Sequence, residues 1–368
     1  MTNVRMPLLW AVIVLGTACF SGSQIAGPDA ALTDARAAET SPDAESGKVV
    51  TMAFAADFAR GTGCRAATVD TLNKGCDIYV TTLDITTGAV SNVKRMTTAD
   101  EPEGFPAIGK DGSIYYNVYS GTATRIGYAI GGETGQLLAN ANHLSIAEDG
   151  TKVVYGDTNG HKLVMAELSA NGKALVNSKP LTGEAMQFEP EIAGDYVIFY
   201  QEFPDAMTKN AQGRLYNLVS ALTVDFTDQD GSAHCTLSPK GTLGTCNNAT
   251  RGGVRGRNIT DGTLGDMKTI IDLKSPTEMA KIDPAYADCT SIAFNFPTFC
   301  GDDTHIVLGA VCAKGTGGEH GSNGVLSKLF LVNLEGSEPR FTNLGDALAT
   351  QAGGIGKDSM TAGCTKKN

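Results

Sequence analysis

The sequence predicts an all-β fold, a β-propeller with six four-stranded blades. Segments with a common pattern recur about every forty residues, which is the length of one four-stranded blade. Within each segment, short strands rich in Val, Ile and Tyr alternate with Asp-Gly and other glycine turns. The chain contains 44 Gly among 368 residues, as expected for many tight turns. Because a lone four-stranded sheet leaves both faces uncovered, we expect the sheets to stack around an axis.

The repeat is clearest in residues 105–137 and 143–175. Each has a short strand, an acidic turn ending in Asp-Gly, a second strand, a polar turn, a third strand and a glycine turn. Two further copies are expected at 189–221 and 296–336, and residues 49–90 resemble a weaker first copy. Together with the divergent blades described next, these copies give a count of six, with five or seven as the alternatives.

Two parts of the chain depart from the repeat. The interval between Pro190 and Pro297 is longer than two periods, so we expect one or two divergent blades there, interrupted by a loop insertion at 226–256. The segment "SEPRFTNL" (337–344) is expected to complete a blade that the N-terminal strand begins. Such a closure would remove the free edges of the sheet.

The repeat units resemble those of a known family. The segments "FPAIGKDGSIYY" (105–116), "LSIAEDGTKVVY" (144–155) and "FPTFCGDDTHIVL" (296–308) are similar to the Pro-Asp-Gly repeats of TolB-type, WD40-like propellers of the bacterial cell envelope. The resemblance covers roughly half of the chain. It departs from the usual pattern because Trp10 is the only Trp. It implies a propeller, export and a binding role, and it transfers no catalytic residues.

The N-terminus predicts export. Residues 1–23 carry one cation, Arg5, then a short apolar stretch and small residues, which is typical of a secretory signal peptide. "LGTAC" (15–19) resembles a lipoprotein signal in which Cys19 is lipidated, although Gly16 stands where Leu is usual, and cleavage after Ser23 or Ala26 is the alternative. The expected location is the periplasm, the outer membrane as a lipoprotein, or the cell surface. A lipidated Cys19 would provide the membrane anchor.

The residues that follow the signal divide into a tether and a propeller. Residues 24–47 are rich in Ala, Asp, Ser, Thr, Pro and Glu and have little to bury, so they are expected to form a disordered tether. An ordinary frayed N-terminus is the alternative. Residues 48–368 are assigned to the propeller.

The remaining eight cysteines are an even set, which suits disulfides in an oxidising compartment. Their spacing predicts two local pairs, Cys64 with Cys76 and Cys235 with Cys246. Three pairings stay open for the last four, although Cys364 is expected to attach the C-terminal segment to the last blade. Those four are Cys289, Cys300, Cys312 and Cys364.

Candidate ligand-binding residues follow from the geometry of a propeller, which binds ligands where the first strand of each blade meets the axis. The repeats place Phe105, His143, Glu189 and Phe296 at this position. Carboxylates that converge there with a histidine would bind a basic partner or a divalent cation. The alternative is that they end exposed strands. The expected ligand-binding residues are Glu101, Glu103, His143, Glu189 and Glu191.

A second candidate is a calcium site at Asp225, Asp228 and Asp230, which precede Gly231. The spacing of a calcium loop is broken and no bidentate Glu follows, so an acidic turn beside the Cys235–Cys246 pair is the alternative. Calcium is the divalent cation considered, and no other cofactor is indicated. Four histidines are scattered and are expected on the surface or in turns, namely His161, His234, His305 and His320.

The function predicted from these features is an exported, non-catalytic binding or scaffold protein whose partner is an envelope protein or a surface ligand. No G-x-S-x-G, H-E-x-x-H, Walker or G-x-G-x-x-G motif occurs in the sequence. The first alternative is a polysaccharide hydrolase or lyase with Glu103 and Glu189 as acid and base. The second is a metal-binding surface protein. A net charge of −11 argues against nucleic acid, and the oligomeric state stays open.

Overall fold

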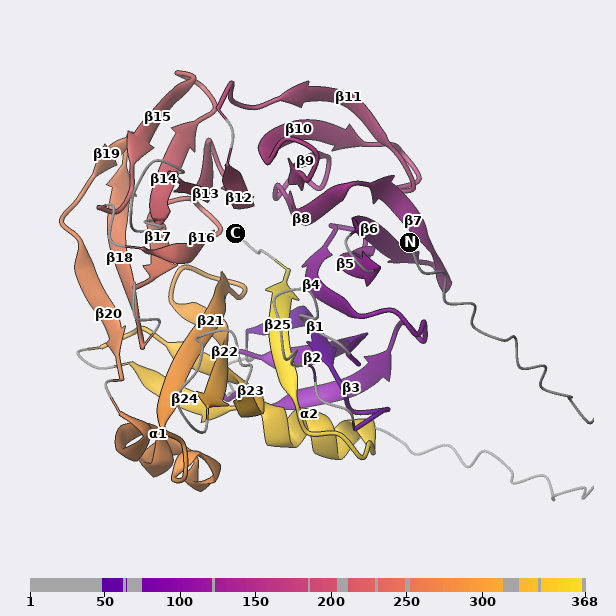
Figure 1. The fold of residues 1–368 in the computed structure, drawn as a ribbon, viewed down its shortest axis with the longest axis vertical. Coiled ribbons are helices and arrows are strands. Elements are labelled where there is room, and N and C mark those ends of the chain that lie inside the picture. The colour runs from indigo at the N-terminus through magenta and orange to yellow at the C-terminus, as the bar shows by residue number, and fades with distance from the viewer. Residues whose placement is uncertain are drawn as a thin grey trace, which may run out of the picture. The chain divides into compact units, whose positions relative to one another are not determined.

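The chain forms a six-bladed β-propeller in the computed structural model (Figure 1), which confirms the predicted fold class and blade count. Every strand pair is antiparallel, as blades built from successive hairpins require. The structure describes residues 48–365 except 62–63, 65–74, 121–122, 185, 204–210, 229–230, 249–251, 274, 314–323 and 337–338. The predicted signal peptide, Cys19 and the tether therefore lie outside the described residues.

The blades follow one another around the axis, and each runs from an inner to an outer strand. Blade 1 contains β25 (Ser359–Cys364), β1 (Val49–Ala56), β2 (Asp77–Asp84) and β3 (Val90–Arg95). Blade 2 contains β4 (Glu103–Ile108), β5 (Ile114–Ser120), β6 (Ala123–Ile130) and β7 (Glu133–Ala139). Blade 3 contains β8 (Ala141–Ile146), β9 (Lys152–Asp157), β10 (Lys162–Leu168) and β11 (Leu175–Pro180).

The second half of the ring is built in the same way. Blade 4 contains β12 (Gln187–Ala193), β13 (Tyr196–Glu202), β14 (Ala211–Asn217) and β15 (Leu222–Asp225). Blade 5 contains β16 (Ala233–Leu237), β17 (Leu243–Asn247) and β18 (Gly253–Thr260), with β19 (Thr263–Leu264) and β20 (Lys268–Asp272) both paired to β18. Blade 6 contains β21 (Ser291–Phe299), β22 (His305–Ala313), β23 (Gly324–Asn333) and β24 (Arg340–Asn343).

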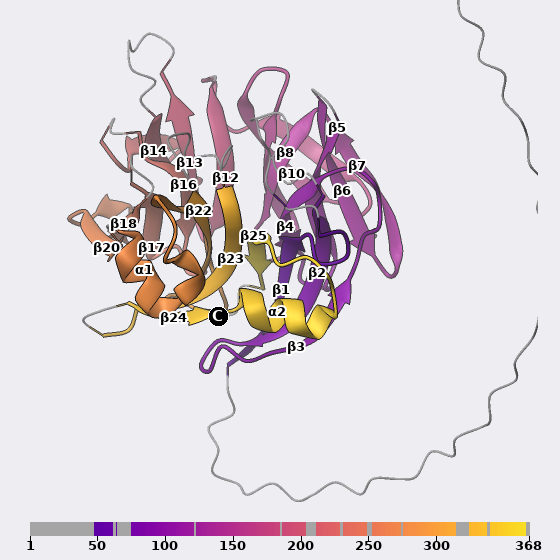
Figure 2. The ribbon, with the colours of Figure 1, turned by 60° about the horizontal axis from the view of Figure 1, so that its bottom comes forward.

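The hydrophobic core lies between neighbouring blades. All nine residues of β22 are buried, because both faces of its sheet are covered. One cluster joins blade 1 to blade 6 and includes Phe54, Leu83, Leu331 and Leu348. Leu348 comes from α2 (Gly345–Ala352), which packs outside these blades (Figure 2). The other helical segments are α1 (Pro276–Ile282) and η2 (Pro284–Tyr286).

The ring closes through β25, which pairs with β1. Closure was expected, but the strand assigned to it was wrong. Arg340–Asn343 from the "SEPRFTNL" segment is β24, the outer strand of blade 6. A disulfide between Cys300 and Cys364 attaches the closing strand to blade 6, which confirms the predicted role of Cys364.

The segment 226–256 is not a loop insertion, because it contains β16, β17 and the beginning of β18. Together with the rest of β18 and with β20, this segment builds blade 5, which is the one divergent blade between Pro190 and Pro297. Its strands were missed because they bury polar residues such as Thr236, Thr245 and Asn247, whose types are typical of loops. The Cys235–Cys246 disulfide joins β16 to β17 and stabilises the blade by restricting the unfolded chain.

The eight cysteines of the propeller form four disulfides. Both predicted local pairs, Cys64–Cys76 and Cys235–Cys246, are confirmed. The four remaining cysteines, whose pairing the sequence left open, form Cys289–Cys312 and Cys300–Cys364. Within the described part of the chain, no helix has the length and apolar character needed to span a membrane.

Candidate functional site

The inner strands of blades 2 to 6 share a β-bulge at the same position. In each, the pairing with the second strand shifts by one residue, as between Gly104 and Ala107 in β4 or Ala233 and Thr236 in β16. The first residue inside the bulge has a positive φ of 48° to 51° although none is glycine. Such a conformation is uncommon outside glycine and costs energy. The five residues are Phe105, His143, Glu189, His234 and Phe296.

These five side chains meet at the axis and form what we call the axial ring. The ring centroids of Phe105 lie 4.2 Å from His143 and 4.4 Å from Phe296, and Phe296 lies 4.1 Å from His234. Glu189 closes the circle, with Oε2 2.5 Å from Nδ1 of His234 and Oε1 3.8 Å from Nδ1 of His143. The bulges therefore aim one side chain from each of five blades at a common point.

Neighbouring blades satisfy backbone groups that the bulges free from the sheet. The Phe105 amide donates to Oγ1 of Thr361 on β25 at 3.0 Å, and the His143 amide donates to Oδ1 of Asn117 at 2.9 Å. In blade 4, the Ile192 amide, which lies beyond the bulge, donates to Oγ of Ser145 in blade 3 at 3.1 Å. Because each bond crosses from one blade to the next, the ring is held by its surroundings and not by local strand geometry alone.

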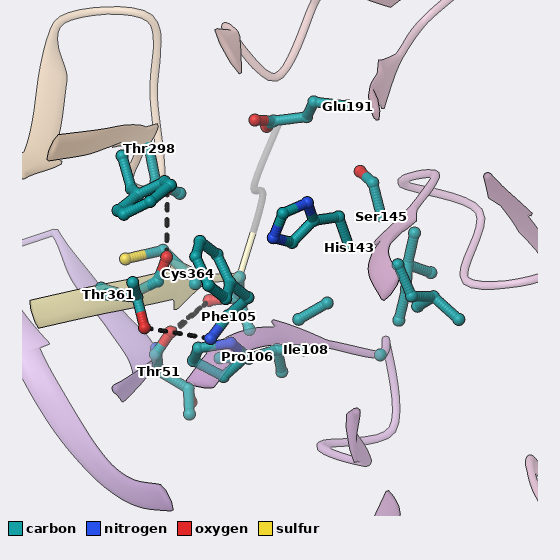
Figure 3. Close-up of a pocket in the computed structure, with 18 of the residues that line it drawn as sticks. Thr51, Phe105, Pro106, Ile108, His143, Ser145, Glu191, Thr298, Thr361 and Cys364 are labelled. Atoms are coloured by element: carbon teal, nitrogen blue, oxygen red, sulfur yellow. Dashed lines mark hydrogen bonds between the residues drawn. The ribbon is translucent and has the colours of Figure 1, made fainter. Parts of the chain in front are cut away.

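A pocket of about 510 Å³ is bounded by the axial ring and by the inner strands of all six blades. This volume suits a small ligand or an inserted side chain. Its walls include hydroxyl groups from Thr51, Thr298 and Thr361, and Figure 3 shows His143 and Glu191 extending toward the same space. The charged residues that line it are Lys110, Glu148, Glu189 and Glu191.

The two histidines of the ring carry hydrogen-bonding atoms without partners among the described residues. Both nitrogens of His143 and Nε2 of His234 are buried and make no hydrogen bond. Burial lowers the pKa of His143, although the charge of Glu189 opposes this effect. A neutral imidazole presents one N–H donor and one nitrogen acceptor, so a ligand at the ring meets unused acceptors.

Three of the predicted ligand-binding residues, His143, Glu189 and Glu191, line this pocket. Glu101 and Glu103 do not. Glu101 pairs with Arg125, whose Nη1 lies 2.9 Å from Oε1. The prediction placed these two glutamates at the axis because Glu103 begins β4 and Glu101 lies two residues before it, but both come before the bulge.

Glu103 occupies a separate, buried site. Its residue surface is 1% exposed, and its carboxylate accepts a hydrogen bond from the hydroxyl of Thr97. Burial raises the pKa of Glu103 to about 7, and the nearby charge of Asp77 adds to the effect. Since Glu103 does not line the axial pocket, the acid and base pair predicted from Glu103 and Glu189 shares no pocket there.

The predicted calcium residues are not gathered into a site in the described part of the chain. Asp225 lies on the outer strand β15 and pairs with Arg214, with Oδ1 3.2 Å from Nε. Asp228 is exposed, and Asp230 lies outside the described residues. Among the residues that the structure describes, no group of three His, Cys, Asp or Glu side chains is arranged to hold a metal ion.

Sequence reasoning missed His234, which was expected on the surface or in a turn but is 6% exposed at the axial ring. His305 lies beside a turn, as expected, although it is only 4% exposed. His305 Nδ1 lies 2.9 Å from Asp302 Oδ1, at the β21–β22 turn. His161 is exposed, and His320 lies outside the described residues. An alignment of "SAHCTL" with the other inner strands would have placed His234 at the bulge, but blade 5 was not recognised as a blade.

The described residues thus define a six-bladed propeller whose axis carries a closed ring of side chains and a pocket. Comparisons with solved structures find the same fold. TolB from Acinetobacter baumannii superposes with a TM-score of 0.55 at 13% identity, covering 86% of this chain and 67% of that one. A chain of a nidogen/laminin complex superposes with a TM-score of 0.52 at 10% identity, covering 87% of this chain and 100% of that one.

The chain therefore has the propeller fold of TolB proteins, which confirms the resemblance seen in the repeat units. No protein family model matches the sequence, and no curated protein matches it. At these levels of identity the comparisons define the fold, and the function has to be argued from the site.

Proposed function

We propose that this protein is an exported, non-catalytic propeller of the bacterial cell envelope that binds a protein or surface ligand in its axial pocket. The observation that carries the proposal is the axial ring. Five non-glycine residues adopt the same left-handed conformation and place their side chains at one point, next to a pocket of about 510 Å³. Backbone strain repeated in this way is typical of a functional site.

Several features support export and a position in the envelope. Four disulfides suit an oxidising compartment, and the N-terminal residues have the pattern of a secretory signal. The fold is that of TolB proteins. A lipid on Cys19 would anchor the protein to the outer membrane, with residues 24–47 as the tether.

The first strand of the propeller contributes to the pocket, because Val49, Val50 and Thr51 at the beginning of β1 line it. A protein that a lipid on Cys19 anchors to the envelope would meet other envelope components first, which favours a ligand that is itself part of the envelope.

Site-specific photo-crosslinking in cells tests the proposal. A photoreactive amino acid is placed at Ser145 in the pocket wall or, as a control, at Val219, which is 77% exposed in the turn after β14. We expect a crosslinked product from the pocket position alone, and we expect Thr298→Trp, which fills the pocket, to abolish it. Equal products from both positions, or a product that survives Thr298→Trp, would refute binding in the pocket. Cell fractionation with and without Cys19→Ala tests the anchor.

A further inference from the structure

We infer that the ligand presents a cationic N–H group, an ammonium or a guanidinium, to the axial ring. The inference rests on the proposed function, because it specifies the chemistry that the axial pocket selects. It is carried by the charge of the lining residues, by the unused acceptors of the two histidines, and by the burial of Glu189.

The charged groups of the pocket are mostly anionic. Glu148, Glu189 and Glu191 line it, against one cation, Lys110. Lys110 is exposed in the turn after β4, whereas the side chain of Glu189 is only 14% exposed at the ring. A ligand that enters the pocket therefore leaves the lysine behind at the rim and meets a carboxylate at the axis.

The burial of Glu189 strengthens its attraction for a cation. Its side chain is only 14% exposed and lies between His143 and His234. Charges interact more strongly where the effective dielectric is low, so a cation gains more from Glu189 here than from an exposed carboxylate. A ligand carboxylate or phosphate would be repelled for the same reason.

The histidines add a requirement for hydrogen-bond donors. His143 and His234 flank Glu189, and Nε2 of each is buried without a partner among the described residues. A neutral imidazole accepts a hydrogen bond at its unprotonated nitrogen only, and the contact of His234 Nδ1 with the Glu189 carboxylate places the proton on Nδ1 and leaves Nε2 as the acceptor. An ammonium or guanidinium carries several N–H groups, and can donate to the carboxylate and to an imidazole at once. A bare metal ion is disfavoured, because the described residues offer no suitable group of three ligands.

The two sources of such a group are a lysine or arginine side chain of a peptide and a small free amine. Both sources present a cationic N–H group to the axial ring, and they differ in the contacts they make with the rest of the pocket wall. A peptide would extend from the axial ring along the walls of the pocket, whereas a small amine would contact the ring alone.

Binding of defined probes to the purified full-length chain tests the inference. The probes are a fluorescent hexalysine peptide, the same peptide with acetylated side chains, a hexaglutamate peptide, and 1,5-diaminopentane as an unlabelled competitor. Fluorescence anisotropy measures the dissociation constants. We expect hexalysine to bind at least about tenfold more tightly than either other peptide, which is the effect of losing about 1.4 kcal/mol. If 1,5-diaminopentane displaces hexalysine, a small free amine is sufficient for binding at the ring.

Matched variants separate a specific site from general electrostatic attraction. Glu189→Gln and Glu191→Gln each remove one negative charge from the pocket, and Glu133→Gln removes one from the exposed Glu133–Lys173 pair on β7. We expect hexalysine to bind about tenfold more weakly to Glu189→Gln, several-fold more weakly to Glu191→Gln, and within twofold of normal to Glu133→Gln. If the circular dichroism of Glu189→Gln shows that this variant does not fold, the hexalysine affinity of Glu191→Gln tests the inference instead.

Two negative results have different meanings. If the acetylated peptide binds as tightly as hexalysine and Thr298→Trp abolishes both, the pocket binds ligands but does not select a cation, and this inference fails alone. An equal loss of binding in Glu133→Gln and Glu191→Gln would also overturn it. If no probe binds and no crosslink forms at Ser145, the proposed function fails together with it.

Discussion

Glu189 Oε2 on β12 lies 2.5 Å from Nδ1 of His234 on β16, although the two residues are 45 positions apart in the chain. His143 on β8 approaches the other oxygen of the same carboxylate at 3.8 Å. One side chain of blade 4 thus connects to blades 3 and 5 at the axis. Unlike the hydrogen bonds from the Phe105 and His143 amides, this contact joins the blades through side chains alone.

The contact between Glu189 and His234 is expected to stabilise the fold. In a double-mutant cycle with Glu189→Gln and His234→Phe, we predict a coupling free energy of roughly 1–3 kcal/mol, since the pair is buried and charge-assisted. Chemical denaturation of the four proteins measures it. The exposed pair of Glu133 and Lys173 is the control, and its coupling free energy should be much smaller because water screens both charges. Equal coupling for the two pairs would mean that the axial contact has no special role.

The disulfide that closes the ring should contribute more than a local one. Cys300–Cys364 spans 64 residues and Cys235–Cys246 spans 11. From the loss of loop entropy in the unfolded chain, we predict that replacing the first pair by serines costs about 4 kcal/mol and replacing the second about 3 kcal/mol. Thermal and chemical unfolding of the two double variants provide the comparison. A smaller loss for Cys300–Cys364 would indicate that β25 closes the ring without covalent help.

The buried carboxyl of Glu103 predicts a pH-dependent stability. Burial raises its pKa from 4.5 to about 7, so the folded protein holds this proton more tightly than the unfolded chain. Its contribution is fully present below pH 4.5 and is lost as the pH rises through about 7. Glu103→Gln, which resembles the protonated form, should therefore be more stable than the wild type at pH 8, by on the order of 3 kcal/mol, and similar at pH 4. Denaturation of both proteins across this range checks it, and a difference that does not change with pH would contradict it.

A buried lysine joins the helical segments to blade 6. Lys328 on β23 is 5% exposed, and its Nζ lies 2.8 Å from Asp283 Oδ2 and 2.9 Å from Asp346 Oδ1. Lys328→Met would leave the buried Asp283 without its cation, so we predict a loss of about 3–5 kcal/mol in the free energy of unfolding. Asp346→Asn should cost less than about 1 kcal/mol, because the Asp346 side chain is 62% exposed. Denaturant titrations measure both values, and comparable losses would show that burial of Asp283 is not the cause.

Local patterns in the sequence predicted the blades and part of the covalent framework. The period of about forty residues and the alternation of strands with Asp-Gly turns depend on short-range chemistry, so they could be recognised without coordinates. The pairs Cys64–Cys76 and Cys235–Cys246 were also predictable, since each closes a short loop. Blade 5 was not, because its inner strands bury Thr236 and Thr245 where the pattern requires apolar residues.

By itself, the sequence determined the fold class, the approximate blade positions and five members of the pocket, namely Phe105, His143, Glu189, Glu191 and Phe296. Only the tertiary structure decided that His234 completes the axial ring and that Glu101 and Glu103 lie outside the pocket. The physical reason is the bulge in each inner strand. One additional residue reverses which side chain faces the axis, and an alternating pattern of apolar and polar residues does not record that reversal.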